Sequence, residues 1–266
     1  MVAKMHRLHL PKIGEGVIHV PGGVPFETDD TEVYPVGSYL RLGNKGFVYA
    51  ESLGITNTGF GVKQDIDQSI GWSNIGADAV VGATQVVVTV ANDAGVLGDG
   101  KVTKDYFKGG EIMIGDTGSR LNVISRGVIG NDALTTAGGD MIVYLDAPIP
   151  VALVEDTSVC EMMASPYRGV KTQTNAHQPV MGMATCIAAS GKFLWLQVEG
   201  ICGGCISQTD FGWISDMQGV FRADGSIGKH DPTDGSEKYQ QHAGFIVAPN
   251  PSNVQGLPFI MLQIAH

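Results

Sequence analysis

The sequence has no uninterrupted apolar run near the ~18–20 residues that a transmembrane helix requires. Its first residues, MVAKMHRLHLPKIGEGV, also lack the apolar core of about 7–15 residues that a secretory signal peptide carries. We therefore expect synthesis in a cytoplasm and no association with a membrane. In that compartment we expect reduced thiols at the four cysteines, Cys160, Cys186, Cys202 and Cys205.

Positive charge is scarce, with 17 Lys and Arg against 27 Asp and Glu and a formal net charge of −10. The densest basic group is Lys4, Arg7 and Lys12, which is too thin to overcome repulsion from a phosphate backbone. Direct binding of nucleic acid is therefore not expected. An acidic surface that keeps the protein soluble is the simpler explanation of the charge.

Helical periodicity is nearly missing as well, and one short helix is considered only for VKQDIDQSI, residues 62–70. The 37 glycines and the short apolar runs instead predict strands joined by tight turns. The predicted strand segments are residues 33–42, 45–52, 83–92, 110–116, 119–129, 140–149, 157–170, 179–189, 192–206, 242–250 and 257–265. The fold class is all-β, with β-barrel or β-sandwich units and an extended N-terminal arm.

We divide the 266 residues into an arm, a β domain over 31–165 and a second, barrel-like β domain over 166–266. Residues 1–30 are interrupted too often by Pro and Gly for a long element, yet they are too apolar for a free tail. An arm lying on a neighbouring protein surface explains both facts, and an arm folded back on its own domain remains open. The interface candidates are Leu8, Leu10, Ile13, Val17, Ile18 and Val20.

One predicted strand is apolar on both faces. Phe193, Trp195 and Gln197 point to one side of the strand. Leu194, Leu196 and Val198 point to the other side. This strand is expected to be buried on both sides or to lie at an interface.

The most suggestive catalytic pattern is Asp116-Thr117-Gly118-Ser119, which matches the signature of aspartic proteases. That chemistry needs two carboxylates sharing one proton, so a single copy would demand a symmetric dimer. Asp-Thr-Gly is also ordinary turn chemistry, and the following SRLNVIS has the pattern of a returning strand. We favour the turn and keep the dimeric protease as an alternative.

Two further groups suggest metal or redox chemistry. Cys202 and Cys205 form a single CxxC, without the second pair or the His-x₃₋₅-His that zinc needs, since His177, His230 and His242 are scattered. Asp224, Asp231, Asp234 and Glu237 lie in a polar loop whose spacing does not match a calcium loop. We therefore predict small buried cysteines and a solvated loop, with no catalytic residue, no cofactor and no metal.

Three segments taken in order carry a resemblance. They are GGEIMIGDTGSRLNVIS, then MIVYLDAPIPVALVEDTSVCEMMASPYRGV, then PVMGMATCIAASGKFLWLQVEGIC, with weaker similarity over residues 240–264. Their order of strands, turns and prolines resembles the head decoration, or cement, proteins of tailed bacteriophages. Residues 1–30 and 53–78 match nothing in that pattern.

This resemblance implies a non-enzymatic virion protein, made in the host cytoplasm, that binds the outer surface of the major capsid protein lattice and stabilises the head. It also implies self-association, commonly as a homotrimer. One alternative is a tail, neck or fibre component of the virion. Another is a carbohydrate-binding β module displayed there, with Trp72, Trp213 and Tyr239 as its aromatic candidates.

Overall fold

The computed structural model describes residues 6–9, 17–20, 24–64, 69–92, 100–116, 119–172, 178–203, 218–230, 240–248 and 259–264. The prediction of an all-β fold is confirmed, because the only helix among these residues is the 3₁₀ turn η1, Val24–Phe26. No helix within the described part has the length and apolarity needed to cross a membrane.

The chain divides into two compact units, which we call the inserted unit, residues 66–166, and the outer unit, residues 1–65 and 167–266. The sequence placed a boundary after Ser165, and the structure places one after Pro166. The structure differs in assigning residues 31–65 to the same unit as the C-terminal part. The reason is long-range pairing, since β4 (Lys45–Glu51) pairs antiparallel with β14 (Phe193–Gly203).

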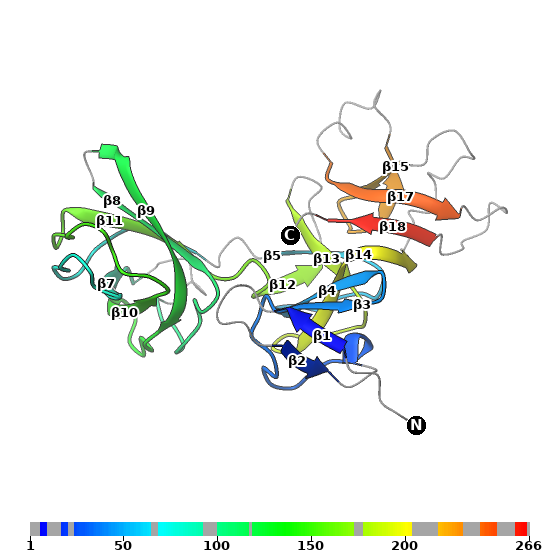
Figure 1. Cartoon of the computed structure of the whole chain (residues 1–266), viewed down its shortest axis with the longest axis horizontal. Coiled ribbons are helices and arrows are strands. Elements are labelled where there is room, and N and C mark those ends of the chain that lie inside the picture. Colours follow the sequence, from blue (N-terminus) through cyan, green and yellow to red (C-terminus); the bar gives the residue numbers. More distant parts are fainter. Residues whose placement is uncertain are drawn as a thin grey trace. The chain divides into compact units, whose positions relative to one another are not determined.

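The inserted unit is a six-stranded antiparallel sheet that curls on itself (Figure 1). Its order is β6-β11-β8-β9-β10-β7, and a bridge between Ile75 and Val88 brings the first and last strands together. Alternating side chains of every strand fill the interior with aliphatic residues, as in a small barrel. The strands are β6 Ser69–Asn74, β7 Gln85–Val90, β8 Glu111–Asp116, β9 Ser119–Asn131, β10 Gly139–Leu145 and β11 Ser158–Met163.

The outer unit holds a 12-stranded sheet in the order β16-β15-β17-β18-β14-β4-β3-β1-β2, with β5, β12 and β13 beside the main path. Besides β4 and β14, its strands are β1 His6–His9, β2 Val17–Val20, β3 Tyr39–Leu42, β5 Gly61–Gln64, β12 Val170–Thr172, β13 Val180–Ala184, β15 Gln218–Phe221, β16 Ile227–Lys229, β17 His242–Ala248 and β18 Phe259–Gln263. The hairpin predicted at Gly43-Asn44 is confirmed, since Leu42 pairs with Lys45.

The strand predicted to be apolar on both faces is β14, and it is buried on both sides. Trp195 and Phe193 pack with Tyr34 and Tyr49 on one face. Leu194, Leu196 and their neighbours pack against a separate aliphatic cluster on the other. β14 is therefore the centre of the outer unit, which explains why its sequence has no polar alternation.

The described parts of the N-terminal arm lie on this same unit. β1 and β2 form a hairpin in which Leu8 pairs with Ile18, and β1 also pairs with β3 through Leu8 and Leu40. This is the alternative in which the arm folds back on its own domain. The backbones of Val17 and Val20 belong to β2, whereas Leu10 and Ile13 lie outside the described residues.

The short helix considered for residues 62–70 was wrong wherever the structure describes that segment. Residues 62–64 belong to β5, and residues 69–70 begin β6. Lys63 is 6% exposed and donates a hydrogen bond to Gln178 Oε1, so a charged residue occupies a buried strand position. Tertiary pairing with β12 and β13 decides the conformation here, because local propensity is weak.

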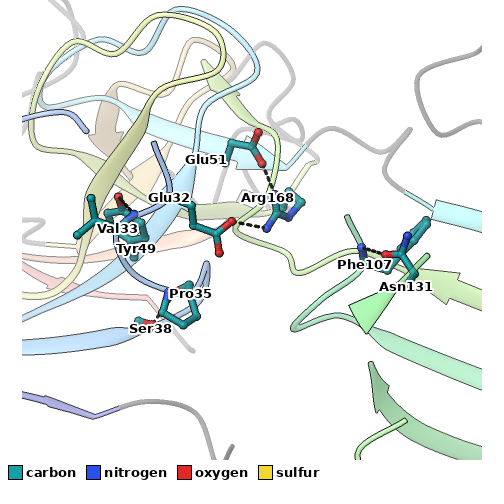
Figure 2. Close-up of polar contacts among 9 residues, drawn as sticks. All are labelled: Glu32, Val33, Pro35, Ser38, Tyr49, Glu51, Phe107, Asn131 and Arg168. Atoms are coloured by element: carbon teal, nitrogen blue, oxygen red, sulfur yellow. Dashed lines mark hydrogen bonds and ion pairs between the residues drawn. The ribbon is translucent and has the colours of Figure 1, made fainter. Parts of the chain in front are cut away.

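In the described part of each unit, a buried polar side chain ties several segments together (Figure 2). In the outer unit the buried Arg168 guanidinium lies 2.7 Å from Glu51 Oε2 and 3.2 Å from Glu32 Oε2. In the inserted unit the buried Asn131 accepts a hydrogen bond from the Phe107 backbone N–H at 2.8 Å. Its amide donates to the carbonyl oxygens of Thr103 at 3.0 Å and Asp132 at 2.8 Å.

Candidate interaction surfaces

The residues suspected of catalysis lie in a hairpin. β8 ends at Asp116, β9 begins at Ser119, and these two residues are paired antiparallel. The prediction that SRLNVIS returns as the second strand is therefore confirmed. Thr117 and Gly118 lie outside the described residues.

The described cysteines are packed as small apolar side chains. Cys202 lies in β14 with its Sγ 3.7 Å from Met183 Sδ, and burial raises the pKa of its thiol to about 11. Burial also raises the pKa of Cys160 to about 12. Such thiols hold almost no nucleophilic thiolate at neutral pH. Cys205 lies outside the described residues.

The histidines and the acidic loop are described only in part. The rings of His230 and His242 are 5.7 Å apart, while His177 lies outside the described residues. Asp224 makes a local turn by accepting hydrogen bonds from the N–H and hydroxyl of Ser226. Asp231, Asp234 and Glu237 also lie outside, and the described part holds no group of three or more His, Cys, Asp or Glu placed to bind a metal ion.

Exposed apolar side chains gather at one loop pair of the inserted unit, which we call the valine patch: Val80, Val81, Val151 and Val154. Val80 and Val81 are 76% and 62% exposed, although turn tips normally carry polar residues. The turn is fixed by the Ala83 N–H bonding the Val80 carbonyl and by Gly82 at a φ of 89°. Gly82 supplies the positive φ that a type II turn needs at this position.

The second half of the valine patch is anchored from below. Ile149 and Leu153 are buried in the core, whereas Val151, midway between them in sequence, is 46% exposed. Ala79 and Leu153 exchange two backbone hydrogen bonds, which holds the two loops side by side. These valines are therefore displayed by a well-anchored scaffold.

The valine patch is bordered by acidic residues. Asp78 Oδ1 accepts a hydrogen bond from the Glu155 N–H, and Asp156 follows directly. The inserted unit as a whole has 13 acidic and five basic residues, a net of −8, whereas the outer unit has 14 and 12, a net of −2. Most of the net negative charge of the chain thus belongs to the unit that carries the valine patch.

A second exposed apolar surface lies in the outer unit, and we call it the sheet patch: Ile201 of β14, Phe245 and Val247 of β17, and Phe259 and Met261 of β18. Phe245, Val247 and Phe259 are exposed, and Ile201 and Met261 are half-buried. β17 and β18, drawn orange and red in Figure 1, are paired neighbours.

One aromatic residue stands apart from both patches. Trp72 in β6 is 58% exposed and has a φ of 46°, which is unusual for a bulky residue. It lies at a bulge where the pairing of β6 with β11 shifts register. The bulge turns the indole outward. The other aromatic candidates, Trp213 and Tyr239, lie outside the described residues.

The interface candidates predicted from the sequence lie in the arm, and neither the valine patch nor the sheet patch was among them. For the sheet patch a signal existed, because Phe245-x-Val247 and Phe259-x-Met261 are apolar at the positions that alternate with the core. For the valine patch there was none, since PVALV has the pattern of an ordinary buried segment.

Comparison with models of protein families, with curated proteins and with solved structures found no match to this chain.

Proposed function

We propose that this chain is a non-enzymatic structural protein of a tailed-phage virion. In this proposal it decorates the head by binding the outer surface of the major capsid protein lattice. The observation that carries the proposal is the valine patch, an apolar surface that faces solvent on a rigid β scaffold. Contiguous exposed apolar patches, especially those with a polar border, mark sites of interaction with other proteins. The virion context of the proposal comes from the order of turns and strands in the sequence, which resembles that of decoration proteins.

The chemistry of the valine patch defines the capsid surface that would fit it. Four valines need an apolar hollow, and the acidic border of Asp78, Glu155 and Asp156 needs Lys or Arg around that hollow. Burying an exposed valine contributes on the order of 1.5 kcal/mol. Many copies on one shell add these contributions at joints that internal pressure tends to open.

The double substitution Val81→Ser and Val151→Ser is expected to weaken attachment to capsid shells about 100-fold, at roughly tenfold for each lost valine contact. The measurement is co-sedimentation with empty shells of the major capsid protein of the same virus, over a range of protein concentrations. Attachment of the unaltered protein is also expected to weaken as salt rises, because the rim contacts are charged.

Val123→Ser is the matched control, because Val123 is 54% exposed on β9 of the same unit but lies outside the patch. It should attach like the unaltered protein. Failure of the unaltered protein to attach to shells would overturn the proposed function. Full attachment of the double variant would show that the protein binds shells through a surface other than the valine patch.

Carbohydrate binding is a second candidate, favoured by Trp72 alone. An outward indole held in a strained backbone conformation is suited to stacking on a sugar ring. If this is the function, Trp72→Ala should abolish glycan-array signals while leaving the unfolding midpoint unchanged. Signals that survive the substitution would remove Trp72 as the binding residue.

A further inference from the structure

We propose that the sheet patch is the contact between copies of this chain, each patch being covered by a neighbouring copy in a closed oligomer. The inference deepens the proposed function, on which it rests for its biological setting, by naming the surface that self-association uses. Its evidence is the register, burial and charge of β14, β17 and β18.

The register of the strands places the five side chains on one face. Ile201 pairs with Met261, and Met261 pairs with Phe245, so these three form a row across β14, β18 and β17. Phe259 lies two residues before Met261, so alternation puts it on the same face. It pairs with Ala248, because the register of β17 with β18 shifts between Ile246 and Ala248. Val247 lies at this irregularity, and its exposed fraction of 50% shows that it faces outward as well.

The opposite face of the same strands is already filled. Ile246, Ile260 and Leu262 are buried in the core of the outer unit. A strand pair that is apolar on both faces, with only one face buried by the part of its own chain that the structure describes, is the pattern of a strand buried at an interface. The sheet patch is therefore suited to a second layer packed on it.

The exposed apolar area of the sheet patch is large enough to form the centre of a contact between two proteins. Three of the five large apolar side chains are about half exposed and two are less so, and together they present up to roughly 400 Å², within the range of the largest patches on ordinary monomers. A stable interface takes roughly 800 Å² from each partner, so the patch supplies its apolar centre and the surrounding polar residues supply the rim.

The low net charge of the outer unit favours a second copy of this chain as the protein that covers the sheet patch. None of the five residues is charged, and the outer unit has a net charge of only −2. Two copies meeting at the valine patch would bring together units of −8, whereas two copies meeting at the sheet patch would not. Flat apolar sheet faces also pack well on each other, about 10 Å apart, as in a β-sandwich.

The test is native mass spectrometry and sedimentation velocity of the full chain, without any shell present. The unaltered protein is expected to form a closed oligomer. Phe245→Asp combined with Phe259→Asp should raise the dissociation constant at least 100-fold and give monomers, because two carboxylates would be buried at the contact. Ile187→Asp is the matched control, since Ile187 is 68% exposed in the outer unit outside the patch, and it should stay oligomeric.

A monomeric unaltered protein, or an oligomer that persists in the double variant, would overturn this inference. If the double variant does not fold, as judged by its circular dichroism, Val247→Asp alone decides the question, with dissociation expected again. Shell attachment is measured separately. A monomer that still binds shells contradicts only the contact between copies, and an oligomer that binds no shell contradicts only the proposed function.

Discussion

Replacement of Asn131 by leucine is expected to lower the free energy of unfolding of the inserted unit by about 3–4 kcal/mol, the largest effect that we predict for a single substitution. Leucine has the same number and branching of side-chain heavy atoms but cannot accept from the buried Phe107 N–H or donate to the carbonyls of Thr103 and Asp132. An unsatisfied buried polar group costs ~1–3 kcal/mol, and three partners lose their bonds here. Urea denaturation measures the loss.

Asn131→Asp tests the same geometry through pH. The new carboxylate would face the two carbonyl oxygens to which the Asn131 amide now donates hydrogen bonds. Because these oxygens and the buried setting disfavour a negative charge, the pKa of the carboxyl group is expected to be higher in the folded than in the unfolded protein. The folded state then binds the extra proton, and stability should rise as the pH falls from 7 toward 4. Asn92→Leu is the control, because Asn92 is exposed and its loss should cost less than ~0.5 kcal/mol. Equal stability of Asn131→Asp at both pH values would contradict this account.

Arg168→Met is expected to destabilise the outer unit by about 2–4 kcal/mol. Methionine keeps the packing of the aliphatic stem but leaves Glu51 and Glu32 facing each other without their shared cation. Breaking a buried ion pair costs ~3–5 kcal/mol, and the value is discounted because the carboxylates are 26% and 33% exposed. Urea denaturation followed by tryptophan fluorescence measures the change.

Two controls separate the ion pairs from other effects of Arg168→Met. Adding Glu51→Gln and Glu32→Gln to it should recover most of the lost stability, since no uncompensated charge is then left. Lys192→Ala breaks an ion pair with Asp30, whose side chain is 83% exposed, and should leave the unfolding midpoint unchanged. An Arg168→Met protein as stable as the unaltered one would show that the cluster contributes little.

Most strands could be predicted from local sequence because their apolar residues alternate or run together. Residues 85–90 and the hairpin at Gly43-Asn44 are examples. β5 and the start of β6 could not be predicted, since Lys63 and Gln64 carry polar side chains in a strand that its partners impose. The pairing of β4 with β14 could not be predicted either, because local patterns carry no information about distant partners.

The candidate surfaces were harder to predict than the fold. A valine in the sequence is most often a core residue, and nothing local distinguishes Val151, which is exposed, from Ile149, which is 1% exposed two residues earlier. The difference arises in the fold, where Ile149 and Leu153 are both hydrogen-bonded to residues 79–83 and buried in the core. The arm, by contrast, was recognised as apolar, and pairing of β1 with β3 gave it a partner in its own chain.

The inserted unit interrupts the sequence of the outer unit, and this sets an order for folding during synthesis. Residues 66–166 leave the ribosome as a continuous segment holding every strand of their own sheet, so this unit can fold at once. The first 65 residues cannot, because β4 waits for β14, roughly 140 residues later. At ~5–20 residues per second this wait lasts roughly 7–28 seconds. Throughout that interval Phe47, Val48 and Tyr49 are without their final neighbours, which makes this segment the natural target for a chaperone.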